Sequence, residues 1–159
     1  MPLSLVFRNP VSRGKIYQAG WKEIPSLPNL AKIDVVVLAA KELPDPPKSK
    51  AGPYAAKVIR IPLDDNFLLD GASQKIILQK AFEVAQEIAR YNQAGKNVII
   101  SCHMGLNRSG LITALSLKLL TGAPARKIIK LIRQQRSPYA LSNPAFCQMI
   151  LATDAIIPA

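Results

Sequence analysis

Hydrophobic residues along the chain form short continuous runs that alternate with longer stretches of helical periodicity. Residues 34–40 (DVVVLAA) and 97–101 (NVIIS) are rich in β-branched side chains, which is typical of strands buried on both faces. Residues 57–63 predict a third strand. The shorter apolar pieces at 5–7 and 16–17 have the length and the flanking turn residues expected of edge strands.

Four further segments have the pattern of helices, and they cover residues 73–91, 111–120, 124–135 and 143–154. The first carries an apolar stripe opposite its charges, and either Ser73 or Asp70 can cap its start. The second is almost wholly apolar, so it is expected to lie at the centre of the fold. Because strands, loops and helices alternate, the sequence predicts an α/β fold with a mostly parallel central sheet flanked by helices.

The length and composition of the chain fit one folded domain over residues 1–159. Hydrophobic residues make up 49% of the chain and charged residues 19%, which excludes a disordered polypeptide. Residues 41–54 (KELPDPPKSKAGPY) contain four prolines and three lysines. We interpret this segment as a surface insertion in the domain.

The cysteine and histidine content limits the chemistry that the chain can perform. The sequence has one histidine, His103, and two cysteines, Cys102 and Cys147, so a metal site with several such ligands is excluded. We expect neither a metal nor a cofactor. The two cysteines do not resemble a disulfide framework, and the longest apolar run, residues 35–40, is too short to span a membrane. These features predict a soluble, cytoplasmic protein with no membrane partner.

The chain is strongly basic. It contains 21 Lys and Arg residues against 10 Asp and Glu residues, which gives a formal net charge of +11. Residues 88–153 alone contain nine basic residues and no acidic one. This balance favours anionic partners, either isolated phosphate groups or a nucleic acid, although a solvated basic surface has the same composition.

One segment, residues 101–110 (SCHMGLNRSG), lies between a predicted buried strand and a predicted buried helix. The N-terminus of a helix offers unpaired N–H groups and a positive dipole end, which together bind anions. Five residues separate Cys102 from Arg108, a spacing that can wrap a loop around a phosphate, and Gly105 permits the tight curvature. The backbone N–H groups expected to bind the phosphate are those of His103, Met104, Gly105, Leu106, Asn107 and Arg108.

Cys102 is the candidate nucleophile of this segment. A free thiol is only a few per cent thiolate at pH 7, but a helix N-terminus and a neighbouring Arg both favour the thiolate. Cys147 has no such surroundings and is interpreted as a small hydrophobic residue. His103 follows Cys102 directly, and because adjacent side chains diverge, we assign it a place in the loop without a chemical role.

The segment resembles the signature loop of the cysteine-dependent phosphatases, His-Cys-x5-Arg-Ser/Thr, and the chain is closest in size to the small dual-specificity phosphatases. Residues 61–66 (IPLDDN) resemble the general-acid loop of that family, and residues 136–146 (RSPYALSNPAF) resemble its Arg-x-Pro … Asn-x-x-Phe stretch. The resemblance accommodates residues 15–152. Ser101 stands where the family usually has the His that precedes the catalytic Cys.

The resemblance implies a phosphatase-like fold and a reaction in two steps without a metal. Cys102 attacks phosphorus and forms a cysteinyl-phosphate, while Arg108 and the loop N–H groups stabilise the phosphate oxygens. Asp65 is the acid that the resemblance assigns to the leaving group, with Asp64 as the alternative. Ser109 is expected to donate a hydrogen bond to the sulfur of Cys102.

The implied substrate is a phosphorylated protein. A chain of this length predicts a shallow pocket, which admits phosphoserine, phosphothreonine and phosphotyrosine. The alternative is an RNA 5′-triphosphatase, because residues 105–110 (GLNRSG) also resemble the Gly-x-Asn-Arg-Ser/Thr-Gly loop of capping enzymes. A third interpretation, an inactive phosphate-binding module, is disfavoured because Cys102, Arg108, Ser109 and an aspartate in the acid segment are all present.

Overall fold

The computed structural model of the protein describes residues 3–26, 33–43 and 57–157. A five-stranded sheet with the order β1-β2-β5-β3-β4 forms its centre. The strands are β1 (Ser4–Arg8), β2 (Lys15–Gly20), β3 (Val35–Leu38), β4 (Lys57–Arg60) and β5 (Val98–Cys102). Most of the segment interpreted as an insertion, residues 44–54, lies outside the described residues.

The sheet is mostly parallel, as the sequence predicts. Strand β5 is central, pairs in parallel with both β2 and β3, and is buried along its whole length. Strand β4 pairs in parallel with β3, and only β1 pairs antiparallel, with β2. The prediction of an edge strand is confirmed for β1 and wrong for β2. Strand β2 lies between β1 and β5, and nearly all of its residues are buried.

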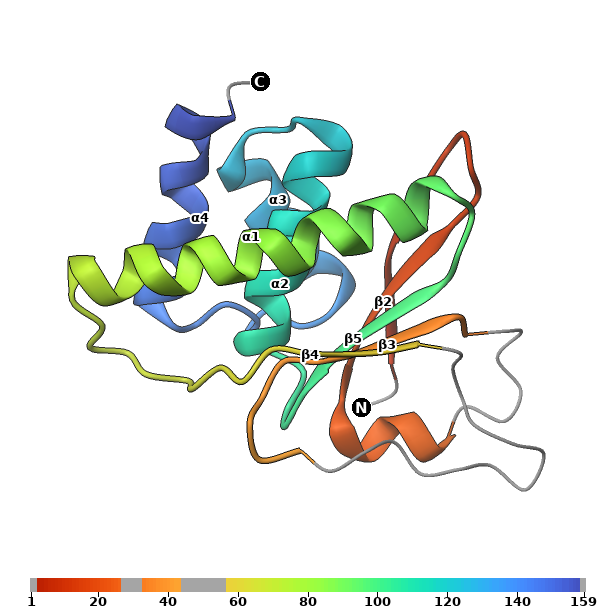
Figure 1. Ribbon diagram of the computed structural model, residues 1–159, viewed down its shortest axis with the longest axis horizontal. Coiled ribbons are helices and arrows are strands. Elements are labelled where there is room, and N and C mark those ends of the chain that lie inside the picture. Colours follow the sequence, from red (N-terminus) through yellow and green to blue (C-terminus); the bar gives the residue numbers. More distant parts are fainter. Residues whose placement is uncertain (1–2, 27–32, 44–56, 158–159) are drawn as a thin grey trace.

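Four α-helices lie on one side of the sheet, and a short 3-10 helix, η1 (Trp21–Ser26), lies on the other (Figure 1). The α-helices are α1 (Gly71–Gln93), α2 (Arg108–Thr121), α3 (Ala125–Gln135) and α4 (Pro144–Ile156). All four correspond to helices that the sequence predicts. The helix η1 has only six residues, which is too short to show a helical pattern of apolar positions. Among the described residues, no helix is both long and apolar enough to cross a membrane.

Local side-chain chemistry sets the ends of these helices. Asp70, not Ser73, caps α1, because its Oδ1 atom accepts a hydrogen bond from the Ser73 backbone N–H at 2.7 Å. Asn143 caps α4 by accepting from the Ala145 N–H at 2.9 Å. Gly122 ends α2 in the left-handed conformation, with φ of 67°. The helix boundaries therefore follow from residues that the sequence displays.

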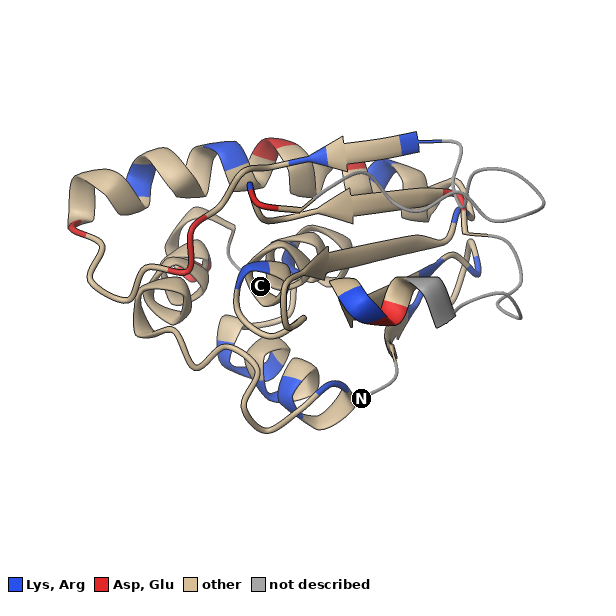
Figure 2. Ribbon diagram, turned by 90° about the horizontal axis from the view of Figure 1, so that it is seen from below, with Lys and Arg blue, Asp and Glu red and all other residues tan. Residues whose placement is uncertain are grey.

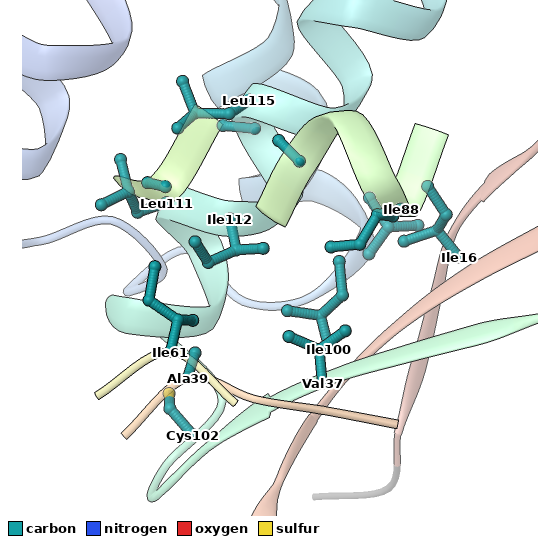
Figure 3. Close-up of a cluster of buried hydrophobic side chains, with 14 of the residues drawn as sticks. Ile16, Val37, Ala39, Ile61, Ile88, Ile100, Cys102, Leu111, Ile112 and Leu115 are labelled. Carbon is teal, nitrogen blue, oxygen red and sulfur yellow. The ribbon is translucent and has the colours of Figure 1, made fainter. Parts of the chain in front are cut away.

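The core lies between the sheet and α2, as Figure 3 shows for part of it. Ile112 of α2 points toward Val37 and Ile100 of the sheet, Leu111 and Leu115 lie farther from the sheet, and all five side chains are at most 1% exposed. Burying each one fully contributes about 1.5–3 kcal/mol to stability. This packing fixes α2 directly after the carboxyl end of β5, so the connection between them is short and held at both ends.

Helix α2 also contains a buried cation, Lys118, which is the only charged residue in its otherwise mostly apolar stretch 111–120. Its Nζ atom donates to Asp154 of α4 at 2.7 Å and to the Ala123 carbonyl at 2.9 Å. A buried ammonium is tolerated only when it is paired, so this contact ties α2 to α4.

Candidate active site

Strand β5 and helix α2 hold the two ends of the candidate loop. Cys102 is the last residue of β5 and Arg108 the first of α2, and the five residues between them form the turn. The Cys102 side chain lies at the end of the core cluster beside Ala39, and the residue is 2% exposed (Figure 3). Its thiol donates to the Ser109 hydroxyl with an Sγ to Oγ distance of 3.2 Å. The sequence analysis expects this contact but in the opposite direction, with the Ser109 hydroxyl as the donor.

The loop leads into the N-terminus of α2. Asn107 occupies the N-cap position, and among the described residues its side chain makes no capping hydrogen bond to the helix. The first turn of α2 therefore keeps backbone N–H groups that can donate hydrogen bonds to a bound anion. His103 and Met104 are exposed, and the His103 carbonyl accepts from the Trp21 N–H at 3.2 Å.

Gly105 rests directly on strand β2. Its φ is 72°, and a Cβ atom there would lie 2.4 Å from both the Ala19 carbonyl carbon and the Gly20 nitrogen. Its carbonyl oxygen accepts from the Gln18 Nε2 atom at 2.9 Å. Only glycine fits this position, because both the conformation and the contact exclude a side chain.

Replacing Gly105 with Ala should reduce both stability and activity. The strained conformation and the backbone overlap should together cost about 2 kcal/mol or more, and the catalytic activity of the site should fall at least about tenfold. Gly122→Ala is the matched control, because Gly122 has a similar φ of 67° but open space around its Cβ position. Thermal unfolding and activity assays measure the two effects. Equal loss of activity in both variants would contradict this role for Gly105.

Arg136 supports the loop from beneath, and sequence reasoning assigned it no role. Its side chain is fully buried and donates to the Gly105 carbonyl at 3.0 Å and to the Met104 carbonyl at 3.2 Å. Glu23 of η1 balances its charge at 2.9 Å, and Glu23 also accepts from the Gly20 N–H at 3.1 Å. A buried ion pair of this kind holds the loop against β2 and η1. In the sequence, the Arg-x-Pro resemblance points to Arg136, but no pattern points to Glu23.

Asp65 is tied to the loop through two amide side chains. Its Oδ2 atom accepts from Asn107 Nδ2 at 2.9 Å, and its Oδ1 atom accepts from Asn143 Nδ2 at 2.8 Å. Asp64, the alternative acid, lies 3.7 Å from Lys41 with both side chains exposed. The structure thus brings Asp65 to the loop and leaves Asp64 on the surface.

Asn107 joins three segments at this point. Besides its bond to Asp65, its Oδ1 atom accepts from the Asn143 N–H at 3.1 Å and from the Ser142 hydroxyl at 3.3 Å. The Leu141 N–H donates to the Leu106 carbonyl at 3.2 Å. The acid segment, the loop and the start of α4 are therefore held together by hydrogen bonds.

Arg108 makes an ion pair that the sequence did not predict. Its Nη1 atom lies 2.8 Å from Glu42 Oε1 and also donates to the Leu63 carbonyl at 3.3 Å. Although burial opposes ionisation, hydrogen bonds from the backbone and from Arg108, together with the Arg108 charge, hold the pKa of Glu42 below its ordinary value. Glu42 lies near the start of the segment interpreted as a surface insertion, and its contact with Arg108 brings that part of the segment to the site.

Ser101, which replaces the family's usual His, is fully buried and turned toward β3. Its hydroxyl donates to the Val37 carbonyl at 3.1 Å. Ser101 thus adds a side-chain bond between β5 and β3, next to Cys102.

Comparison with known proteins decides the family. The family model described as "Dual specificity phosphatase, catalytic domain" matches residues 16–155. The chain belongs to the dual-specificity phosphatase family. This dual-specificity phosphatase resembles the crystal structure of human DUSP28, with a TM-score of 0.76 and 19% identity over 100% of this chain and 97% of that chain. No curated protein sequence matches it.

Two further solved structures share the fold of this dual-specificity phosphatase. DUSP15 is 22% identical, with a TM-score of 0.71 over 96% of this chain and 86% of that chain. The human tyrosine phosphatase-like serine/threonine/tyrosine-interacting protein is 13% identical, with a TM-score of 0.72 over 99% of both chains. At these identities the structures establish the fold, while the family match establishes that the chain is a protein phosphatase.

Proposed function

We propose that this phosphatase hydrolyses phosphotyrosine, phosphoserine and phosphothreonine in proteins through a cysteinyl-phosphate on Cys102. The observation that carries the proposal is the position of the Cys102 thiol. It lies at the carboxyl end of the central strand, hydrogen-bonded to Ser109, with the N-terminus of α2 and Arg108 directly after the loop. That arrangement provides a nucleophile, an anion site and a countercharge within one short segment.

In the first step, the Cys102 thiolate attacks phosphorus, the S–P bond forms and the P–O ester bond breaks. Backbone N–H groups of residues 103–108 and the Arg108 guanidinium stabilise the phosphate oxygens as charge moves onto them. Glu42 engages the Nη1 atom of Arg108. Within the described residues no hydrogen bond uses its Nε or Nη2 atoms, so these donors are available to phosphate as a bidentate pair.

Asp65 gives its proton to the leaving oxygen in this step. In the second step its carboxylate takes a proton from water as the water oxygen attacks phosphorus and the S–P bond breaks. Ser109 then donates its hydroxyl proton in a hydrogen bond to the departing thiolate, reversing the direction of the bond seen with the thiol. Asn107 and Asn143 act as positioning residues that hold Asp65 at the loop.

Side-by-side assays without added metal test this function. A phosphotyrosine peptide, a phosphothreonine peptide and a 5′-triphosphate RNA should be compared at the same enzyme concentration. We expect both phosphopeptides to be hydrolysed with a kcat/KM well above that for RNA. Hydrolysis of the RNA with little phosphopeptide activity would replace the proposal with the triphosphatase alternative.

Arg108→Lys should lower kcat/KM by about 10²–10³-fold, because a point charge cannot reproduce the planar pair of donors. The loss should be divided between weaker binding of inorganic phosphate and slower turnover. Arg90→Lys is a suitable control, because Arg90 is exposed near the end of α1 and is not a residue of the proposed site. An Arg108→Lys enzyme within about twofold of wild type would place Arg108 outside the reaction.

A further inference from the structure

An open groove of about 830 Å³ lies between α3 and α4, bounded at one end by the turn at residues 136–138. We call it the α3–α4 groove. Its volume is in the range of sites that bind ligands or short peptide segments. None of the proposed reacting residues lines it. The groove is therefore a separate feature of the surface, and its walls indicate what it can bind.

One wall of the groove is basic. Arg126, Lys130 and Arg133 line it, and their spacing of four and three residues places them on one face of α3. In Figure 2, the helix nearest the N label carries several blue bands and no red one. Within the described residues, no carboxylate lies within ion-pair distance of these three side chains. An anionic ligand would relieve the repulsion among them.

The nearest acidic group is already engaged. Asp154 accepts from Lys118 at 2.7 Å and from the Ala125 N–H at 2.9 Å. These hydrogen bonds, and then the charges of Lys118 and Arg126, hold the pKa of Asp154 below its ordinary value. Asp154 therefore interacts with Arg126 through its charge, but its ion pair is with buried Lys118 and not with a residue of the basic wall.

The floor of the groove is apolar. Ile129, Pro138 and Leu151 line it, and Leu151 is 40% exposed although it is a large hydrophobic residue. The Cys147 thiol also lines the groove and donates to the Leu141 carbonyl at 3.0 Å. Burial raises the pKa of Cys147 although the charge of Arg133 opposes it, so the thiol is neutral at pH 7. An apolar side chain would bury this floor.

Lys127 does not belong to the basic wall. It lines a different pocket, of about 460 Å³, together with Phe7 and Leu131. Arg126 lines the α3–α4 groove and not this second pocket, and Lys127 lines the second pocket and not the groove. Replacing either of these adjacent residues with Glu changes the net charge by the same amount, but the two substitutions lie in different pockets.

The groove is connected to the phosphate-binding loop through shared residues. Arg136 lines the groove and donates to the Gly105 carbonyl of the loop. Arg133 donates to the Leu141 carbonyl at 2.9 Å, and the Leu141 N–H donates to the Leu106 carbonyl. A ligand in the groove would thus lie on the segment that supports the loop, which is the position expected for a substrate chain that also reaches Cys102.

We propose that the α3–α4 groove binds an acidic peptide segment with an apolar side chain, contributed by the phosphoprotein substrate at a distance from its phosphorylated residue. The carboxylates meet Arg126, Lys130 and Arg133, and the apolar side chain meets Leu151 and Ile129. RNA fits less well, because proteins bind single strands by stacking bases on aromatic rings and none of the described lining residues is aromatic. The proposal rests on the proposed function.

A fluorescein-labelled, unphosphorylated peptide of Glu and Leu tests the groove by fluorescence anisotropy. Arg126→Glu should weaken binding of this peptide about tenfold, because like charges then face each other. Lys127→Glu, with the same change in net charge, should leave the affinity within about twofold. Leu151→Ser should weaken binding several-fold, whereas Ile156→Ser, at a more exposed site on the same helix outside the groove, should not.

Equal losses in Arg126→Glu and Lys127→Glu would overturn the proposal, because binding would then reflect net charge alone. The proposal would also be overturned, in favour of a nucleic acid ligand, if a single-stranded RNA bound more tightly than the peptide, displaced it, and kept its affinity in Leu151→Ser. Arg126→Glu should also hydrolyse a short phosphopeptide that lacks the acidic segment within about threefold of wild type.

The binding assay separates this proposal from the proposed function. If the peptide binds as expected but no phosphopeptide is hydrolysed, the substrate assignment fails and peptide binding by the groove stands. If phosphopeptides are hydrolysed and the acidic peptide does not bind, the groove proposal alone fails.

Discussion

Cys102→Ser should abolish turnover and still bind oxyanions. A serine hydroxyl at this position is a poor nucleophile, and it leaves Arg108, the loop N–H groups and the fold unchanged. Because the uncatalysed hydrolysis of phosphate monoesters is among the slowest reactions known, loss of the nucleophile should bring the rate to background. The Cys102 side chain packs at the end of the core and bonds to Ser109, and a hydroxyl can keep that bond.

Two measurements on Cys102→Ser separate chemistry from folding. Turnover of a phosphotyrosine peptide should be undetectable, while calorimetry should still record tungstate or phosphate binding close to that of wild type. Cys147→Ser is the control, because Cys147 lies in the α3–α4 groove, away from the loop. Undiminished turnover in Cys102→Ser, or equal loss in Cys147→Ser, would contradict the assignment.

Asp65→Asn should slow hydrolysis of esters with poor leaving groups by about 10²–10⁴-fold, which is the usual contribution of a positioned acid. The kcat/KM of aryl phosphates with good leaving groups should fall much less, because kcat/KM reports the first step and their leaving oxygens need no proton. A purely structural effect would slow all esters alike.

Asp64→Asn is the matched control for this variant. Asp64 precedes Asp65 and lies at ion-pair distance from exposed Lys41, whereas Asp65 accepts hydrogen bonds from Asn107 and Asn143. We expect a rate within about twofold of wild type for Asp64→Asn with every ester. The leaving-group pattern in Asp64→Asn and its absence in Asp65→Asn would shift the acid by one residue.

The sequence predicts the fold well where local chemistry determines it. The hydrophobic runs of β3 and β5, the cap at Asp70 and the stop at Gly122 act within a few residues, so each could be recognised without the structure. The loop from Cys102 to Arg108 was equally visible, because the strand before it and the helix after it are both strongly apolar.

The supports of the site could not be predicted in the same way, because they are contacts between distant segments. Glu42 reaches Arg108 from a proline-rich stretch, and Glu23 reaches Arg136 from a helix without periodicity. Gln18 on β2 bonds to Gly105 only because β2 lies beside β5, an arrangement that the apolar run at 16–17 does not reveal. In each case the residue type is ordinary and the position in space creates the role.

The helix boundaries show a smaller difference of the same origin. The sequence predicts that the central helix begins at residue 111, where its apolar run starts, but α2 begins at Arg108. Ser109 and Gly110 are not large apolar residues, so the sequence does not predict that they begin a buried helix. Both residues are nevertheless buried. A Cβ atom at Gly110 would lie 2.8 Å from the Leu141 side chain. The small residues at the start of α2 therefore reflect close packing with the segment before α4.

Trapping of the covalent intermediate tests the central claim most directly. An aryl phosphate with a good leaving group, which forms the intermediate without a proton donor, is mixed with Asp65→Asn, in which breakdown of the intermediate is slowed; the reaction is quenched in acid within milliseconds, and the protein is digested and analysed by mass spectrometry. We expect phosphate on the peptide that contains Cys102, and none when Cys102 is also replaced by Ser. Phosphate on another residue, or steady turnover with no phosphate on Cys102 at any time, would contradict the proposed reaction.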